Sequence, residues 1–171
     1  IYEGIINYEL HLRYYVNILR FAHYPDAYQT IGSSMAVRSK IYQKQGGMNK
    51  RKAGEDFYFL HKIIPLGNFS ELKTTKVIPS PRVSDRVPFG TGKAIGDFMQ
   101  QEDRNIYYTY NIQSFLDLKQ FLEKVEDLYT YTNEELKSLL ISLPESIKNY
   151  LTELSIEKHL PKIQKQSNTL S

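Results

Sequence analysis

Apolar residues that recur every three or four positions are the feature that most constrains how this chain of 171 residues can fold. This spacing puts side chains on one face of an α-helix, whereas a half-buried strand would alternate at every second position. The pattern covers much of the chain and predicts a helix-rich fold. Its members are Ile5, Tyr8, Leu12, Tyr15, Leu19, Phe115, Leu118, Leu122, Val125, Leu136, Leu139, Leu140, Leu143, Ile147, Leu151 and Leu154.

Three short runs between these helices favour β-structure. Residues 31–37 are small and apolar and predict a buried strand, and residues 69–72 and 76–78 are shorter strand candidates. We therefore expect an α+β fold with a small mixed β-sheet in residues 1–110. Residues 111–171 are expected to form a helical bundle whose last ten residues fray.

Helix starts are marked by capping residues. Ser39 is placed to cap a short helix through residue 45. Thr132 with Glu135, and Ser142 with Glu145, match the capping-box spacing, in which a hydroxyl and a carboxylate three positions later satisfy each other's backbone amides.

Composition excludes several classes of protein. Without cysteine the chain can have neither a disulfide framework nor a thiolate metal site, which is compatible with the cytoplasm. No apolar run approaches the ~20 residues that span a bilayer, and no signal peptide follows Ile1. The net charge of +3 is too small to predict nucleic-acid binding by itself. The 14 tyrosines fit either a compositional bias or the rims of clefts.

Glu55 and Asp56 begin a predicted helix and have two interpretations. Acids at a helix start are common, because the helix dipole favours them by ~0.3–1 kcal/mol. Here, however, they follow a glycine pair at 46–47, a basic stretch at 50–52 and Gly54. A flexible cationic loop that delivers a carboxylate suits a substrate with phosphates and hydroxyls, where the carboxylate accepts a proton.

Four ordered segments resemble the second half of a family 2 glycosyltransferase domain of the bacterial GT-A type. They read Gly-Ser-Ser-Met-Ala-Val-Arg at 32–38, Gly-Gly-Met at 46–48 and Gly-Glu-Asp-Phe-Tyr-Phe-Leu at 54–60, then Pro-Ser-Pro-Arg-Val-Ser-Asp-Arg-Val-Pro-Phe-Gly-Thr-Gly-Lys at 79–93. The resemblance covers residues 28–98 and implies that residues 1–110 are a Rossmann-like remnant of such a domain.

The resemblance implies an inverting transfer of a sugar from a nucleotide-sugar donor to a hydroxyl of a sugar or lipid-linked acceptor. Asp56 takes the position of the family's catalytic base, a role worth ~10²–10⁴ in rate. Glu55 would orient the loop or contact acceptor hydroxyls. Gly46, Gly47 and Gly54 would let the backbone approach the sugar closely.

The family's metal motif is missing. Family members bind Mg²⁺ or Mn²⁺ through an Asp-x-Asp motif, which occurs nowhere in this sequence. We therefore expect the donor- and metal-binding half to lie upstream of Ile1, and the isolated chain to be inactive. His61 is a weak candidate for a metal ligand, and the alternative is a packed or solvated histidine. The absence of tryptophan disfavours a processive polymerase.

A polar loop supplies the remaining candidates for substrate binding. Arg82, Ser84 and Arg86 alternate, so an extended backbone would turn them to one side, where guanidinium groups suit the donor diphosphate or a phosphorylated acceptor. The alternative is that the arginines pair with carboxylates. Lys93 follows a Gly-Thr-Gly turn that fails the Walker pattern, because Val87 stands where a glycine is required.

Other classes of function are alternatives to a glycosyltransferase. The stretch from Arg38 to residue 52 could serve a basic module that binds nucleic acid, with tyrosines stacking on bases, although no recognised nucleic-acid-binding motif occurs. The helical tail could be a protein-interaction scaffold, or could contact the inner membrane face peripherally. A halved sheet would expose strand edges, which predicts self-association.

Overall fold

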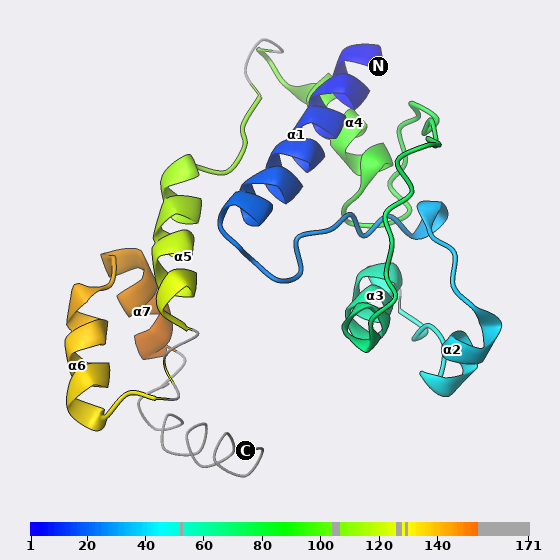
Figure 1. Ribbon diagram of the computed structural model, residues 1–171. Coiled ribbons are helices and arrows are strands. Elements are labelled where there is room, and N and C mark those ends of the chain that lie inside the picture. Colours follow the sequence, from blue (N-terminus) through cyan, green and yellow to red (C-terminus); the bar gives the residue numbers. More distant parts are fainter. Residues whose placement is uncertain (52, 104–106, 126–127, 129, 154–171) are drawn as a thin grey trace. The chain divides into compact units, whose positions relative to one another are not determined.

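The computed structural model describes residues 1–51, 53–103, 107–125, 128 and 130–153 (Figure 1). Helices make up 57% of the described residues, and no strand occurs among them. For this part of the chain, the predicted α+β class with a small mixed sheet and a Rossmann-like remnant is wrong. The helices are α1 (Tyr2–Phe21), α2 (Ser39–Lys44), α3 (Glu55–Ile63), α4 (Thr91–Gln100), α5 (Ile112–Val125), α6 (Asn133–Ser142) and α7 (Glu145–Glu153), with the 3₁₀ turns η1 (Gly32–Ser34) and η2 (Ile64–Leu66).

The three predicted strands fail for one physical reason. β-branched and aromatic residues favour a strand mainly when neighbouring strands give their side chains a pleated, half-buried surface to pack against. Residues 31–37 instead contain the tight turn η1. In the irregular segment that follows η2, the side chains of Leu72 and Ile78 are 75% and 84% exposed.

The helical predictions are largely confirmed, although not every cap is. Residues 5–20 lie within α1, and the helices expected from Ser39, from Glu55 and at 115–125 all form. The residue before α2 is Arg38, and no side chain caps the helix, so the predicted cap by Ser39 is wrong. Lys52 of the basic stretch and the last ten residues lie outside the described residues.

The chain divides into two compact units. The first contains residues 1–14 and 28–108, and the second contains residues 15–27 and 109–171, so the division passes through α1. In the first unit, α1 and α4 pack closely where Gly4 meets the ring of Phe98, since a Cβ on this glycine would lie 3.0 Å from the ring (Figure 1). Ile95 of α4 and Phe59 of α3 are also buried.

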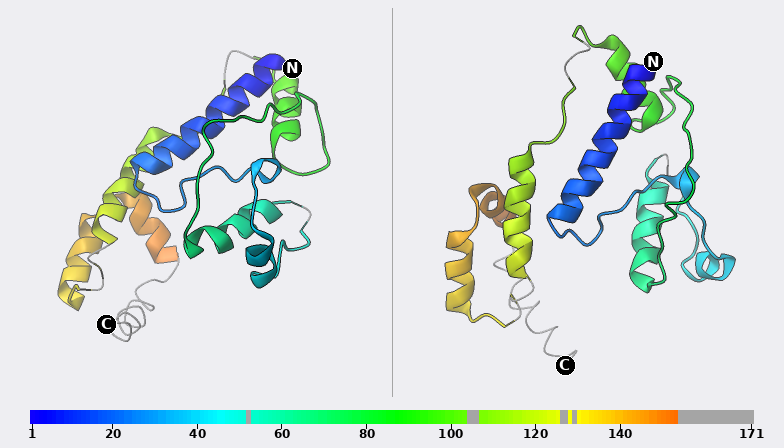
Figure 2. Two further views of the ribbon diagram at one scale, coloured as in Figure 1. Left: turned by 45° about the vertical axis from the view of Figure 1, so that its right-hand side comes forward. Right: turned by 45° about the horizontal axis from the view of Figure 1, so that its top comes forward.

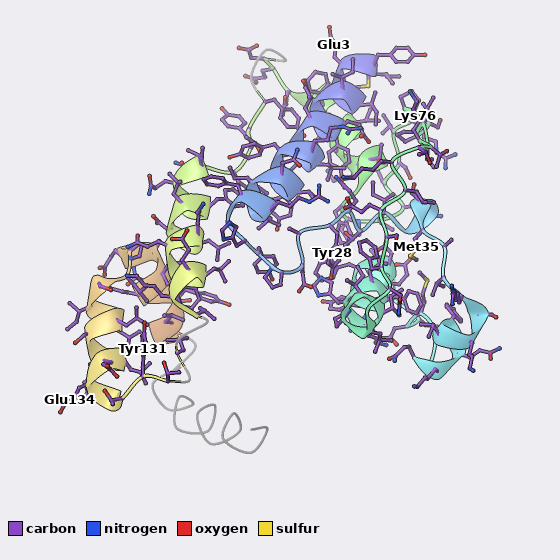
Figure 3. The ribbon with its side chains drawn as sticks, viewed as in Figure 1. Glu3, Tyr28, Met35, Lys76, Tyr131 and Glu134 are labelled. Atoms are coloured by element: carbon purple, nitrogen blue, oxygen red, sulfur yellow. The ribbon has the colours of Figure 1, made fainter. Side chains whose placement is uncertain are left out.

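The second unit has a core rich in leucine, formed where α5, α6 and α7 lie together (Figure 2). The predicted capping box of α6 is confirmed: Glu135 N–H donates to the Thr132 hydroxyl, and Thr132 N–H donates to the Glu135 carboxylate. The second predicted box is wrong, because Ser142 ends α6 and its hydroxyl donates to the Leu139 carbonyl. The buried core residues are Leu139, Leu143 and Leu151, with Phe121, Leu128, Tyr131 (labelled in Figure 3), Leu140 and Ile147 partly buried against them.

Candidate active site at the start of α3

Asp56 lies in the first turn of α3 and fixes that helix to η1. Gly54 precedes the helix with a left-handed φ of 76°, and Glu55 and Asp56 follow where the helix dipole favours negative charge. The Oδ2 of Asp56 accepts a hydrogen bond of 2.8 Å from Gly32 N–H, and its Oδ1 accepts one of 2.8 Å from Phe57 N–H. The carboxylate is partly buried, and it bridges two segments that lie 24 residues apart.

Gly32 makes this bridge sterically possible. A Cβ at position 32 would lie 2.7 Å from the Oδ2 of Asp56 and 2.8 Å from its Cβ. These separations are shorter than van der Waals contact, so any larger residue would displace the carboxylate. The first of the four resembling segments is therefore in direct contact with the third.

The polar loop also contacts the start of α3. Ser84 N–H donates to the Gly92 carbonyl at 3.2 Å, which closes the base of the loop formed by residues 84–92. Phe89, near the tip of this loop, lies against Gly54, where a Cβ would be 3.6 Å from the ring. The fourth segment thus contacts the residue that begins α3.

The glycine pair has a structural explanation of its own. Gly46 N–H donates to the backbone carbonyl of Gln43, and Gly47 N–H donates to that of Tyr42. Both glycines have positive φ. This is a Schellman motif, in which a left-handed residue ends a helix and satisfies its last carbonyls. The ring centroid of Tyr42 lies 5.2 Å from that of Phe59, so the end of α2 is held against α3. Approach to a sugar stays a prediction for these glycines.

The loop arginines are exposed and carry no ion pair within the described residues. Arg86 N–H donates to the Ser84 hydroxyl at 3.4 Å, which forms a local turn rather than a straight extended segment. Arg82 and Arg86 therefore do not pair with described carboxylates, and phosphate binding stays a prediction. Lys93, by contrast, pairs with Asp97 one turn further along α4.

His61 lies among aromatic rings. Its ring centroid is 4.2 Å from that of Phe57 and 6.0 Å from that of Tyr28, which Figure 3 labels beside α3. Within the described part of the chain, no three His, Asp or Glu residues gather in a way that could hold a metal ion. These contacts support the packed alternative for His61.

Aromatic residues that were not singled out from the sequence also gather at α3. Arg51 lies over the ring of Tyr58, 3.9 Å from its centroid, and Phe57 and Tyr58 pack edge to face at 5.3 Å. The spacing of Phe57 and His61, four residues apart on a predicted helix, could have indicated a shared face. The contact of His61 with Tyr28 could not have been predicted from this spacing, because it depends on how the chain folds back.

The perturbed pKa values of the first unit belong to another ring cluster, on α1. Burial raises the pKa of Tyr8, with a smaller effect from Tyr107, and burial raises the pKa of Tyr107. Burial lowers the pKa of His11, whose ring contacts both tyrosines. Ring packing accounts for these shifts, which do not involve the residues at the start of α3.

Comparison of the chain with protein-family models, curated proteins and solved structures finds no match. Among the described helices, none is both long and apolar enough to cross a membrane.

Proposed function

We propose that this chain is the acceptor-side part of an inverting glycosyltransferase of family 2, with Asp56 as the catalytic base. One observation carries the proposal: the start of α3 is in contact with η1 through Gly32 and with the polar loop through Phe89. The first and the fourth of the ordered segments on which the resemblance rests therefore each contact the third, which carries the carboxylate. Packing of Tyr42 against Phe59 holds the helix that precedes the glycine pair to the same element.

In the proposed reaction, Asp56 accepts the proton of the acceptor hydroxyl while the hydroxyl oxygen attacks the anomeric carbon of the donor. The bond from that carbon to the nucleoside diphosphate breaks on the opposite face, and the diphosphate leaves with the electron pair. Gly32 N–H holds one oxygen of the carboxylate and so fixes its orientation. The exposed Arg82 and Arg86 are the groups proposed to bind the diphosphate or a phosphorylated acceptor.

The metal expected from the resemblance finds no ligand set in the described residues, so no step above depends on one. Glu55 is proposed to contact acceptor hydroxyls, because it is the neighbour of Asp56 in the first turn of α3. The proposal places the protein in the cytoplasm, at the inner membrane face where the acceptor is lipid-linked.

The test is Asp56→Asn in the protein that carries this chain. Nucleoside diphosphate release is measured with UDP-, GDP- and TDP-sugars and a mixture of saccharide acceptors. Loss of the base should lower kcat by ~10²–10⁴. The asparagine carbonyl can still accept the Gly32 hydrogen bond, whereas Phe57 N–H loses its acceptor, so the free energy of unfolding should fall by only about 1 kcal/mol.

Asp103→Asn is the matched control, since it makes the same chemical change at an exposed acid outside the resembling segments. It should keep wild-type turnover. If Asp56→Asn also turned over at the wild-type rate, or if it lost activity only in step with its thermal stability, the carboxylate would be a structural link and not a base.

A further inference from the structure

Five rings form a continuous row along α3 and beside it. The row comprises Tyr58, Phe57, His61, Tyr28 and Phe69, and we call it the aromatic row. Consecutive ring centroids are separated by 5.3, 4.2, 6.0 and 5.6 Å. Each ring is therefore held by its neighbours, which reduces the conformational entropy that the row would lose on binding a ligand.

One ring of the row is buried in the protein, and three others are exposed to solvent. Tyr28 is buried, with 8% of its surface exposed, and ties the row to the fold. Phe57, Tyr58 and Phe69 are 42%, 45% and 45% exposed. Most aromatic rings of this size stabilise a protein by burial, so the neighbouring exposed rings of Phe57 and Tyr58 form a surface suited to binding, and Phe69 adds a further exposed ring beyond Tyr28.

A basic stretch precedes the row in the chain, and one of its cations contacts the row, while the acids Glu55 and Asp56 lie between the two in sequence. Residues 27–54 contain no Asp or Glu, but they contain the cations Arg38, Lys40, Lys44, Lys50, Arg51 and Lys52. Arg51 lies over Tyr58 at one end of the row, and Lys62 of α3 approaches Asn49 at 3.5 Å. The part of this stretch that the structure describes exposes its cations to solvent. An anionic ligand would be attracted there.

We infer that the aromatic row and Arg51 bind a saccharide that carries an anionic group, as the acceptor of the proposed reaction. One face of a pyranose ring presents C–H groups, which pack on aromatic faces, while a carboxylate or phosphate on the sugar pairs with the guanidinium. Phe57 directly follows Asp56, so a sugar on the row would lie close to the proposed base. This inference rests on the proposed function, because it names the substrate class of that site.

The experiment measures binding alone, without turnover. The protein is applied to an array of immobilised glycans, in which uronate-bearing and phosphate-bearing glycans stand beside neutral counterparts. Retention of anionic glycans above their neutral counterparts is expected, and it should fall as salt is raised. The class that is retained identifies the anionic group. Tyr58→Ala and Arg51→Gln should each weaken binding about tenfold, the scale found for stacking and charge-assisted contacts.

Two matched controls use exposed residues of α1. Tyr2→Ala removes a ring that is 75% exposed, and Arg13→Gln removes a cation whose ion pair, among the described residues, is with Glu9 one turn away. Both should bind as the wild type does. The inference is overturned if no anionic glycan is retained, if neutral glycans are retained equally well, or if a twelve-nucleotide single strand of DNA binds more tightly than any glycan.

The two proposals can fail separately. Asp56→Asn should retain glycan binding, because it keeps the rings and Arg51. Binding that survives in a protein with no glycosyl transfer would refute the proposed reaction and leave the binding site. Transfer that depends on Asp56 but occurs without any binding of anionic glycans would refute the binding site alone.

Discussion

The two units of this protein are stabilised in different ways. In the second unit, three short helices share one core of leucines, and their polar links join residues of those helices, as in the 2.6 Å hydrogen bond from Ser146 to Asp117. In the first unit, long irregular connections are held by single close contacts such as Asp56 with Gly32. Burial stabilises both units, since Phe59, Ile95 and Phe98 of the first are almost fully buried. The first unit also depends on a few specific positions in its irregular connections, and these are its candidate functional residues.

The largest expected effect tests whether the second unit is stabilised on its own. Leu143 is 3% exposed within its core, so Leu143→Ala removes buried methyl groups and leaves a cavity. Such substitutions cost about 2–5 kcal/mol. Hydrogen exchange should show lost protection in α5, α6 and α7 and unchanged protection in α3 and α4.

The control is Ile141→Ala, two residues away in α6, where the side chain is 77% exposed. It should change stability by less than about 0.5 kcal/mol. Equal loss of protection in both units of the Leu143 variant would show that they unfold together, and the contrast between them would not hold.

A smaller effect is expected in the first unit from Gly32→Ala. The new methyl would meet the Asp56 carboxylate, and overpacking of this kind costs about 1–3 kcal/mol. In an Asp56→Ala background the same change should cost less, because the carboxylate oxygen 2.7 Å from the new methyl is gone and only the Cβ of residue 56, at 2.8 Å, remains in its way. Thermal unfolding of the four proteins gives the coupling energy, expected at about 0.5–3 kcal/mol.

Ser34→Ala serves as the comparison for Gly32→Ala, since it adds no atom to the same turn and its side chain is exposed. Additive effects of Gly32→Ala and Asp56→Ala would mean that the contact does not hold η1 to α3.

A still weaker effect is expected from acid on the second unit, through two of its carboxyl groups. Hydrogen bonds from Ser146, and then from Gln113, lower the pKa of Asp117, and the hydrogen bond from Thr132 N–H lowers the pKa of Glu135. A carboxyl whose pKa is lowered by folding stabilises the folded state above its unfolded pKa, about 3.9 for Asp and 4.3 for Glu. That contribution is lost as the pH falls below these values and through the lowered folded pKa.

Carboxyl titration by NMR checks both groups. Ser146→Ala should return the pKa of Asp117 toward its ordinary value and flatten the acid dependence of unfolding in the second unit. An unchanged pKa of Asp117 in that variant would show that the hydrogen bond from Ser146 does not stabilise the carboxylate in solution.

The sequence predicted the helices well because their signals are local. The leucine spacing of α6 and the pairing of Thr132 with Glu135 each lie within a few residues, where helix geometry alone decides what meets. The strand predictions at 31–37, 69–72 and 76–78 failed because a strand requires partners elsewhere, and residue preference does not specify them.

The candidate site was predictable only in its parts. The acids at the start of α3 follow from Gly54 and the helix pattern, but the contact of Asp56 with Gly32 joins residues that no short spacing connects. For the same reason, one end of the aromatic row could not be foreseen, since Tyr28 and Phe69 come from outside α3.

The packing of the polar loop on α4 limits which sequences can replace this one. At Gly92 a Cβ would lie 3.0 Å from the backbone nitrogen of Ser84, and at Gly96 it would lie 3.2 Å from a methyl of Val83. The Cβ of Ser84 would be closer still, at 2.6 Å, so an alanine at 92 requires both a change at position 84 and a shift of the loop backbone. A smaller residue at position 83 would make room for alanine at 96. Positions 83 and 96 can therefore vary as a pair, whereas a side chain at position 92 also requires the backbone to move.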